Sequence, residues 1–406
     1  MRALHVVPSL SLRFGGPPVA VLEAARALRD LGWDCAVVAT DLAEPASWSG
    51  RRVVDADLPE GAREVDVRLC PARWPYRLAY SPALTRALDE LAPSVDVVHI
   101  HMLFQYPQFA AFRAARRAGV PYVVTPHGAL DPHLRRRSRL LKALTDLLWQ
   151  RRMLDGAAAL HFTTADEARL VSDLGFRAPT VVAPNGIRWA SFQRLPSGRA
   201  FREWYLGGHD GPVVMNLGRL SHKKGLDILV RAFARAARER SDAVLALVGP
   251  DDEGLTPRLR SLAASEGVAD RIVFVGMLAG EEKRAALAAA DVWALPSHTE
   301  NFGLAVVEAM AAGKAVVISP AVNLASEISA AGAGLVRPQT PDAFAVALSE
   351  LLADPGRREA LGRRARAFAR RYDWSAVAPA WAALYERALG LPELTRAGVE
   401  SDVRAG

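Results

Sequence analysis

The sequence predicts an α/β protein built from two doubly wound parallel sheets. At 406 residues the chain exceeds the roughly 250–300 residues at which a single hydrophobic core stops growing. Half of its residues are hydrophobic and 23% are charged, which is the composition of a folded protein with a large core. Short β-branched apolar runs alternate with helical patterns, as in βαβ units, and the alternation starts again after residue 212. Two domains are therefore expected.

Apolar runs predict the strands, and helical patterns separate most of them, for example over 19–31, 82–91 and 108–118. The strands expected first are 4–8, 35–40, 65–70, 97–101, 122–126, 158–163 and 180–183. A stretch rich in Gly and Pro over 185–212 is the expected linker. The strands expected after it are 213–217, 243–248, 271–275, 292–295, 315–319 and 335–337, followed by helices over 342–353 and 356–371. A last helix, rich in aromatic residues, closes the ordered chain.

The composition indicates in which kind of cellular compartment the protein is expected. The two cysteines, Cys35 and Cys70, imply no disulfide framework and favour a reducing compartment such as the cytoplasm. Pro8 and Arg13 interrupt the N-terminal apolar run, which is too short for a signal peptide. The sequence contains no uncharged apolar run of the 18 or so residues that a spanning helix needs. A soluble or peripheral protein is expected.

The formal charge of +7 is concentrated in one segment, 134–155, where seven basic residues face two Asp. The basic residues are Arg135, Arg136, Arg137, Arg139, Lys142, Arg151 and Arg152. Leucines recur at helical spacing among them, namely Leu140, Leu141, Leu144, Leu147 and Leu148. This is the composition of an interfacial helix that docks on an anionic membrane. The alternative is a helix whose leucines pack on the N-terminal sheet while its arginines face water. We expect no nucleic acid partner.

Gly15 and Gly16 follow the first predicted strand and precede a helix. Glycines let the backbone approach a ligand closely, and the start of a helix offers free N–H groups to an anion. The spacing is not the GxGxxG pattern of dinucleotide binding, so a tight turn is the alternative.

Three histidines fall at the carboxyl ends of neighbouring predicted strands. His99 and His101 share one face of a strand, but no third ligand follows at a diagnostic spacing, so no metal is expected. His127 stands at a corner between strand and loop, where a titratable group meets the cleft. A structural role is its alternative.

Cations gather where the strand 213–217 ends. Arg219, Lys223 and Lys224 lie between Gly218 and Gly225, close to the start of a helix. This combination predicts a phosphate cradle. A solvated basic loop is the alternative.

Two glutamates flank the next candidate, near the end of the strand 292–295. Glu300 precedes a helix start, so the amides of 302–304 can face an anion. Glu308 lies inside that helix beside Val307 and Met310, where a buried carboxylate needs a partner such as the hydroxyl pair of a ribose. An exposed glutamate on a surface helix is the alternative.

With these residues the chain resembles the retaining glycosyltransferases of family 4, which have the GT-B fold. The resemblance spans nearly the whole chain, from Gly15-Gly16 through Arg219 and Lys224 to the E-x7-E pair Glu300 and Glu308. The segments 126–132, 322–324 and 332–336 further resemble members that build bacterial exopolysaccharides and other surface glycans.

The resemblance implies two Rossmann-like domains that face each other across a cleft. The N-terminal domain, 1–187, would bind the acceptor, and a C-terminal helix over about 374–390 would pack back on it. The domain 188–373 would bind the nucleotide-sugar. Two departures from the family pattern are Arg188, where Asp is usual at the hinge, and Lys314, in place of the usual Gly-x-Pro after Gly313.

The resemblance also implies roles for single residues. Arg219 and Lys224 would hold the donor diphosphate and neutralise the leaving group, Glu300 would contact the transferred sugar, and His127 would touch it near the reacting carbon. Glu308 would bind the ribose. The other donor-binding residues implied are Gly15, Gly16, Met277, Leu278, Phe302, Gly303 and Leu304. No cofactor or metal is implied, because Arg and Lys neutralise the charge.

The expected activity is retaining transfer from a UDP-, GDP- or ADP-sugar to a glycan or lipid-linked glycan acceptor, in bacterial polysaccharide biosynthesis. Localisation would be cytoplasmic or peripheral on the inner face of the cell membrane, with Arg135, Arg136, Arg137 and Arg139 on the membrane and acceptor side. Two alternatives remain. A nucleotide-sugar 2-epimerase would share the two-domain form and convert the donor without an acceptor. A non-catalytic basic adaptor for membranes or polyanions would leave Glu300 and Glu308 unexplained.

Overall fold

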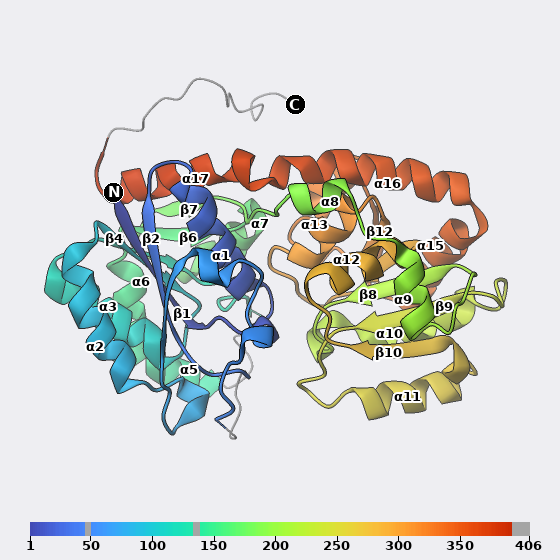
Figure 1. Ribbon diagram of the computed structural model, residues 1–406, viewed down its shortest axis with the longest axis horizontal. Coiled ribbons are helices and arrows are strands. Elements are labelled where there is room, and N and C mark those ends of the chain that lie inside the picture. Colours follow the sequence, from blue (N-terminus) through green and yellow to red (C-terminus); the bar gives the residue numbers. More distant parts are fainter. Residues whose placement is uncertain (45–49, 133–138, 392–406) are drawn as a thin grey trace.

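The computed structural model describes residues 1–44, 50–132 and 139–391, which form two α/β units lying side by side (Figure 1). Each unit holds one parallel sheet with helices on both faces. The predicted class, α/β with two doubly wound domains facing each other across a cleft, is confirmed.

In the described residues the first sheet has seven parallel strands in the order β3-β2-β1-β4-β5-β6-β7. They are β1 (Arg2–Ser9), β2 (Asp34–Thr40), β3 (Asp66–Cys70), β4 (Val97–His101), β5 (Tyr122–Thr125), β6 (Ala159–Phe162) and β7 (Thr180–Val182). Its helices are α1 (Gly16–Arg29), α2 (Pro82–Leu91), α3 (Tyr106–Ala118), α5 (Arg139–Thr145), α6 (Arg151–Asp155) and α7 (Ala165–Leu170). Helices α2 and α3 pack on one face, and α1 and the C-terminal helix on the other.

The second sheet repeats this order within the described chain, as β10-β9-β8-β11-β12-β13. Its strands are β8 (Val213–Leu217), β9 (Val244–Val248), β10 (Ile272–Gly276), β11 (Val292–Leu295), β12 (Ala315–Ile318) and β13 (Leu335–Val336). The helices around it are α8 (Ala190–Gln193), α9 (Gly198–Tyr205), α10 (Leu226–Ala236), α11 (Thr256–Ser265), α12 (Gly280–Ala289), α13 (Leu304–Ala311), α14 (Ala325–Ala330), α15 (Pro341–Ala353) and α16 (Pro355–Ala369). In both sheets the chain order reverses beside the first strand, and ligands of such sheets bind at that point, outside the carboxyl ends of the strands.

The linker predicted over 185–212 is wrong for much of its length, because the segment contains α8 and α9. Trp189, Phe192 and Phe201 are buried in the same core as β8. Burial of these apolar side chains stabilises the two short helices. The Gly and Pro residues that suggested a linker lie at the ends of these helices.

The chain crosses between the units twice, and the two crossings pair with each other. The N–H of Ile187 donates to the Tyr372 carbonyl at 2.7 Å, and the N–H of Trp374 donates to the Ile187 carbonyl at 3.2 Å. The second crossing joins α16 to α17 (Trp374–Ala388), which run one after the other along the top of both units (Figure 1). Helix α17 packs against α1 of the first unit.

The basic segment is not one continuous α-helix. After α5 the chain makes a turn of π-helix over Asp146–Gln150 and continues as α6. Leu144, Leu147 and Leu148 are 50%, 78% and 60% exposed, so these three leucines do not pack on the sheet. Arg135, Arg136 and Arg137 lie outside the described residues, as do the side chains of Arg139, Leu140 and Leu141. Among the described residues, no helix combines the length and apolarity needed to cross a bilayer.

Candidate functional site in the cleft between the sheets

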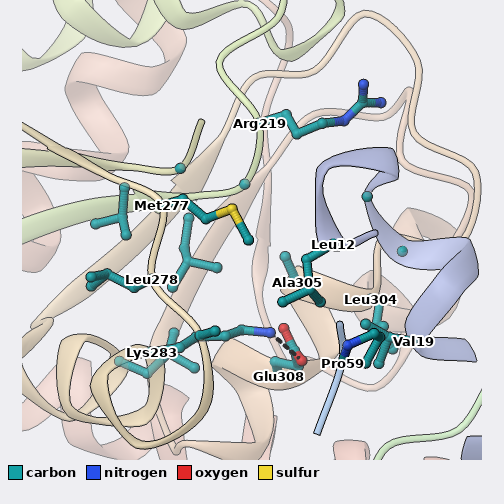
Figure 2. A pocket seen from close by; sticks show the side chains of 18 of the residues that line it. Leu12, Val19, Pro59, Arg219, Met277, Leu278, Lys283, Leu304, Ala305 and Glu308 are labelled. Atoms are coloured by element: carbon teal, nitrogen blue, oxygen red, sulfur yellow. Dashed lines mark hydrogen bonds and ion pairs between the residues drawn. The ribbon is translucent and has the colours of Figure 1, made fainter. Parts of the chain in front are cut away.

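A cavity of about 290 Å³ lies between the two units, at the carboxyl ends of β1, β8 and β9. Figure 2 shows its walls, with Met277 and Leu278 on one side, Leu12 and Val19 on the other, and Arg219 at one end. Most of the predicted site residues line it, namely Gly15, Gly16, Arg219, Lys224, Met277, Leu278, Glu300, Leu304 and Glu308. Residues from distant parts of the sequence therefore meet in one cleft.

Gly15 lets Arg219 come close to the start of α1. Its φ is +89°, a conformation that L side chains rarely adopt, and an added Cβ would lie 3.3 Å from the Arg219 Nε. The start of α1 and the guanidinium therefore face the same part of the cleft. Free N–H groups at a helix start and a guanidinium both favour a phosphate.

Lys224 and Glu300 form an ion pair at the centre of the site. Lys223 approaches the same carboxylate, with 3.9 Å between its Nζ and Oε2. Burial raises the pKa of Glu300, but the ammonium groups of Lys223 and Lys224 outweigh burial and lower this pKa to about 2. Glu300 is therefore ionised and already partnered.

The backbone holds Glu300 in place. Its N–H donates to the Ala321 carbonyl at 2.9 Å, and its own carbonyl accepts from the N–H of Asn323 at 3.0 Å. Gly303, with φ of +76°, then turns the chain into α13. The Phe302 side chain is buried and packs edge-on against Tyr372, 5.3 Å between ring centroids, so only its backbone amide is available to a ligand.

Glu308 has a partner that the sequence does not reveal, the ammonium group of Lys283. The Glu308 Oε1 accepts from the Lys283 ammonium group at 2.6 Å (Figure 2). Glu308 is only 8% exposed. The expectation that this carboxylate needs a partner when buried is therefore confirmed, and the partner is Lys283. Lys283 stands in the first turn of α12 beside Glu281, Glu282 and Arg284, where nothing in the sequence distinguishes it from a solvated helix end.

His127 lies in a smaller cavity with Lys223, Thr299 and Asn301. Its φ is +51°, in the left-handed region. At the neighbouring position, Gly128 has a φ of +77° and would bring a Cβ within 3.1 Å of the Asn301 Cβ. The loop after β5 thus touches the loop that carries Glu300.

Side-chain hydrogen bonds join the same two loops and units. The Thr299 hydroxyl donates to Asp131 at 2.9 Å, and the Asn301 amide donates to the Thr163 hydroxyl at 3.1 Å. Arg188, the departure from the family pattern at the hinge, pairs with Glu23 of α1, and its Nε lies 3.2 Å from Oε2. None of these partners could be predicted from the sequence, because each pair is far apart along the chain.

His99 and His101 lie inside the first unit, behind His127, and are buried with His5 of β1. Ring nitrogens of these three residues lie within 4.8 Å of one another. Nothing in the sequence marks His5 as their neighbour, because it pairs with His99 only once β1 lies beside β4. Each ring nitrogen of the three is hydrogen-bonded to a protein side chain.

Comparison with known proteins agrees with this architecture. Residues 202–368 match the family model described as Glycosyl transferases group 1, and residues 15–186 match the Glycosyl transferase 4-like domain. The D-inositol 3-phosphate glycosyltransferase of Stackebrandtia nassauensis is 31% identical over 383 residues, which span 90% of this chain and 85% of that protein.

Two solved structures have similar folds. The Anabaena protein HepE, in complex with UDP and glucose, has a TM-score of 0.76 at 22% identity over 94% of this chain and 98% of its own. Sucrose-phosphate synthase from Thermosynechococcus elongatus has a TM-score of 0.75 at 21% identity over 96% and 99%. Paired doubly wound domains with a cationic cleft between them define the GT-B architecture. The chain belongs to the glycosyltransferases of the family 4 type and is an enzyme that transfers a sugar.

Proposed function

We propose that this enzyme transfers a sugar from a UDP-sugar, with retention at the anomeric carbon, to an acceptor bound on the side of the N-terminal unit. One observation carries the donor assignment. The cleft places Lys223 and Lys224 against the carboxylate of Glu300 with Arg219 close enough to influence it, and the apolar side chains of Met277 and Leu278 form part of its wall. A diphosphate needs the excess positive charge, and a nucleobase needs the apolar wall.

An exchange of partners would admit the donor. A diphosphate that accepts hydrogen bonds from Lys224 competes with Glu300 for that ammonium group. Glu300 is then free to accept a hydrogen bond from a hydroxyl of the transferred sugar. Positive charge beside the departing diphosphate lowers the barrier because negative charge builds up there in the transition state.

Glu308 and Lys283 would share the nucleoside. The carboxylate of Glu308 would accept hydrogen bonds from the ribose hydroxyls while it stays paired with the Lys283 ammonium group. The base would lie near Gly276, the last residue of β10, and the following Met277 and Leu278. Uracil is favoured over guanine and adenine because HepE is described with UDP.

Retention is proposed through a front-face route, in which the departing phosphate accepts the proton of the acceptor hydroxyl. Glu300 has a pKa of about 2 under the influence of burial and of Lys223 and Lys224, so it is a poor proton acceptor. The same three cations neutralise the leaving group, so we propose that no divalent ion is required.

For the acceptor we propose a glycan or lipid-linked glycan at the inner face of the membrane, of the kind used in polysaccharide biosynthesis. The exposed Leu144, Leu147 and Leu148 beside a strongly basic segment support membrane docking. The name of the Stackebrandtia relative favours a second candidate, a small phosphorylated polyol. Adding each acceptor class to enzyme and donor and comparing the products separates the two.

A donor screen tests the proposal. Purified enzyme is melted with UDP-, GDP- and ADP-sugars, and UDP-sugars should raise the Tm, since ligand at 100 times its Kd adds about 2.7 kcal/mol. A rise with GDP- or ADP-sugars alone contradicts the base assignment. Conversion of the donor without an acceptor would favour an epimerase, and binding of lipid with no nucleotide affinity would favour an adaptor.

A further inference from the structure

A continuous chain of buried hydrogen bonds runs beneath α17, from the strand β7 side of the first sheet to the cleft. Its members are His161, Thr125, His99, Tyr385, His5, His101 and His127. All except His127 are completely buried. The strands β1, β4, β5 and β6 carry the histidines buried in this chain and Thr125. Tyr385 comes from α17, 286 residues after His99.

The donor and the acceptor in every hydrogen bond of this chain can be assigned, starting from the bond between His161 and the Ala183 carbonyl. The Ala183 carbonyl can only accept, so the His161 Nε2 must donate to it, at 2.8 Å. A neutral imidazole has one N–H, so the His161 Nδ1 accepts, and the Thr125 hydroxyl donates to it at 2.8 Å. The Thr125 oxygen then accepts from the Nε2–H of His99 at 2.6 Å.

The same reasoning continues to the cleft. The His99 Nδ1 accepts from the Tyr385 hydroxyl at 2.7 Å, and the Tyr385 oxygen accepts from the Nε2–H of His5 at 3.4 Å. The His5 Nδ1 accepts from the Nε2–H of His101 at 3.1 Å. The His101 Nδ1 in turn accepts from the Nε2–H of His127, also at 3.1 Å.

Burial keeps the imidazoles neutral, as this reasoning requires. It lowers the pKa of His5 to about 3, that of His127 to about 3 and that of His161 to about 4. Burial and repulsion between neighbouring rings lower the pKa of His99 and His101 as well. A metal ion held by His5, His99 and His101 would have to replace hydrogen bonds that already occupy all their ring nitrogens.

We propose that this chain holds His127 as the tautomer protonated on Nε2, so that its Nδ1 is an acceptor for a hydroxyl group in the cleft. Tyr385, His5, His99 and His101 are then positioning residues that act through His127. The proposal rests on the proposed function only in that His127 faces the transferred sugar. The tautomer itself can be measured without activity.

Nitrogen NMR of the full-length protein with 15N-labelled histidine rings reads the tautomer at pH 7.5. The signals of His127 are assigned by their loss in His127→Gln. Wild type should show His127 as a single Nε2–H tautomer. A His127 protonated on Nδ1, or on both nitrogens, overturns the proposal, as does a shift of the His5, His99 and His101 nitrogens to a metal-bound state when zinc chloride is added.

Tyr385→Phe removes the hydroxyl that donates to His99 and accepts from His5. Without it the tautomer of His99 no longer fixes that of His5, so His127 should populate both tautomers. The enzyme's kcat should fall on the order of tenfold, the loss expected when one fixed hydrogen bond no longer orients a group, with the donor KM within about twofold. The matched control is Tyr122→Phe, which removes a buried hydroxyl of the same unit that donates to the Met153 carbonyl and lies outside the chain. In this variant the tautomer of His127 and the kcat of the enzyme should be those of wild type.

A second pair of variants covers the case in which Tyr385→Phe does not fold. Thr125→Val breaks the chain between His161 and His99, whereas Thr125→Ser keeps the hydroxyl. Valine should give mixed tautomers and the lower kcat, and serine should restore both. An unchanged tautomer in the folded Tyr385→Phe and Thr125→Val variants overturns the proposal. A fixed Nε2–H tautomer in an enzyme that transfers no sugar would refute the proposed function instead.

Discussion

The ammonium group of Lys224 is paired with the carboxylate of Glu300 in the cleft, and their side chains are only 11% and 12% exposed. Breaking a buried ion pair without replacing it is costly, because a desolvated charge is left without a partner. A ligand that opens this pair must therefore offer Lys224 an anion and Glu300 a donor. A sugar linked to a diphosphate offers both at once.

Removing one cation tests this exchange. Arg219→Ala and Lys224→Ala should lower kcat by on the order of a hundredfold each while the fold is retained, because their charge matters most as the diphosphate leaves. Arg238→Ala, which removes an exposed cation in the turn after α10, is the control and should keep wild-type kcat. Turnover that persists in the Arg219→Ala, Lys224→Ala double variant would place the diphosphate elsewhere.

Glu308→Gln should weaken donor binding by roughly 1.5–3 kcal/mol, or about ten- to a hundredfold in Kd, because a charged acceptor is lost and Lys283 is left unpaired. Titration calorimetry with a UDP-sugar measures this Kd. Glu282→Gln, on the exposed face of α12, should leave Kd unchanged. Equal Kd values for Glu308→Gln and wild type would remove Glu308 from the ribose site.

Much of the fold could be predicted from the sequence. Each predicted strand corresponds to an observed one, because buried parallel strands are β-branched apolar runs bounded by turns and helices. The helices α8 and α9 were missed because they are short and lie among Gly and Pro residues. The π-helical turn at Asp146–Gln150 has no sequence pattern that separates it from an α-helix.

Most of the site residues that could be predicted follow the end of a strand. Arg219, Lys224 and Glu300 follow β8 and β11 directly, so a parallel sheet must bring them to one edge. Lys283 depends on how α12 faces α13, and the pairing of His5 with His99 depends on strand order. Both follow from packing between distant segments, which a single sequence does not reveal.

The buried histidines predict a pH dependence of stability. Their pKa values are lower in the folded protein than the ordinary 6.5, to about 3 for His5 and about 4 for His161, so the unfolded chain binds more protons below pH 6.5. The free energy of unfolding should therefore fall as the pH drops from 6.5, by about 1.4 kcal/mol per pH unit for each such histidine.

Urea denaturation at pH 7.5 and 5.5 measures this slope. His161→Gln should reduce it by the share of one histidine, whereas His222→Gln, which changes an exposed residue, should not. Equal stability of wild type at both pH values would mean that the histidines are not held neutral in the fold.

Liposome sedimentation tests the membrane proposal. Binding should require anionic lipid and weaken with salt, since each basic residue near the surface contributes about 1 kcal/mol. It should be lost when Arg135, Arg136, Arg137 and Arg139 become Ser, and it should weaken when the exposed Leu144, Leu147 and Leu148 become Ser. Equal pelleting with neutral lipid, or no pelleting with either, would contradict membrane docking and leave the transferase unaffected.

The most direct measurement is product analysis by NMR, with enzyme, a UDP-sugar and an acceptor in the presence of excess EDTA. Release of UDP together with a glycoside that keeps the anomeric configuration of the donor is the predicted result. A product of inverted configuration, or activity that EDTA abolishes and Mg²⁺ restores, would contradict the proposed front-face, metal-independent transfer by Arg219, Lys224 and Glu300.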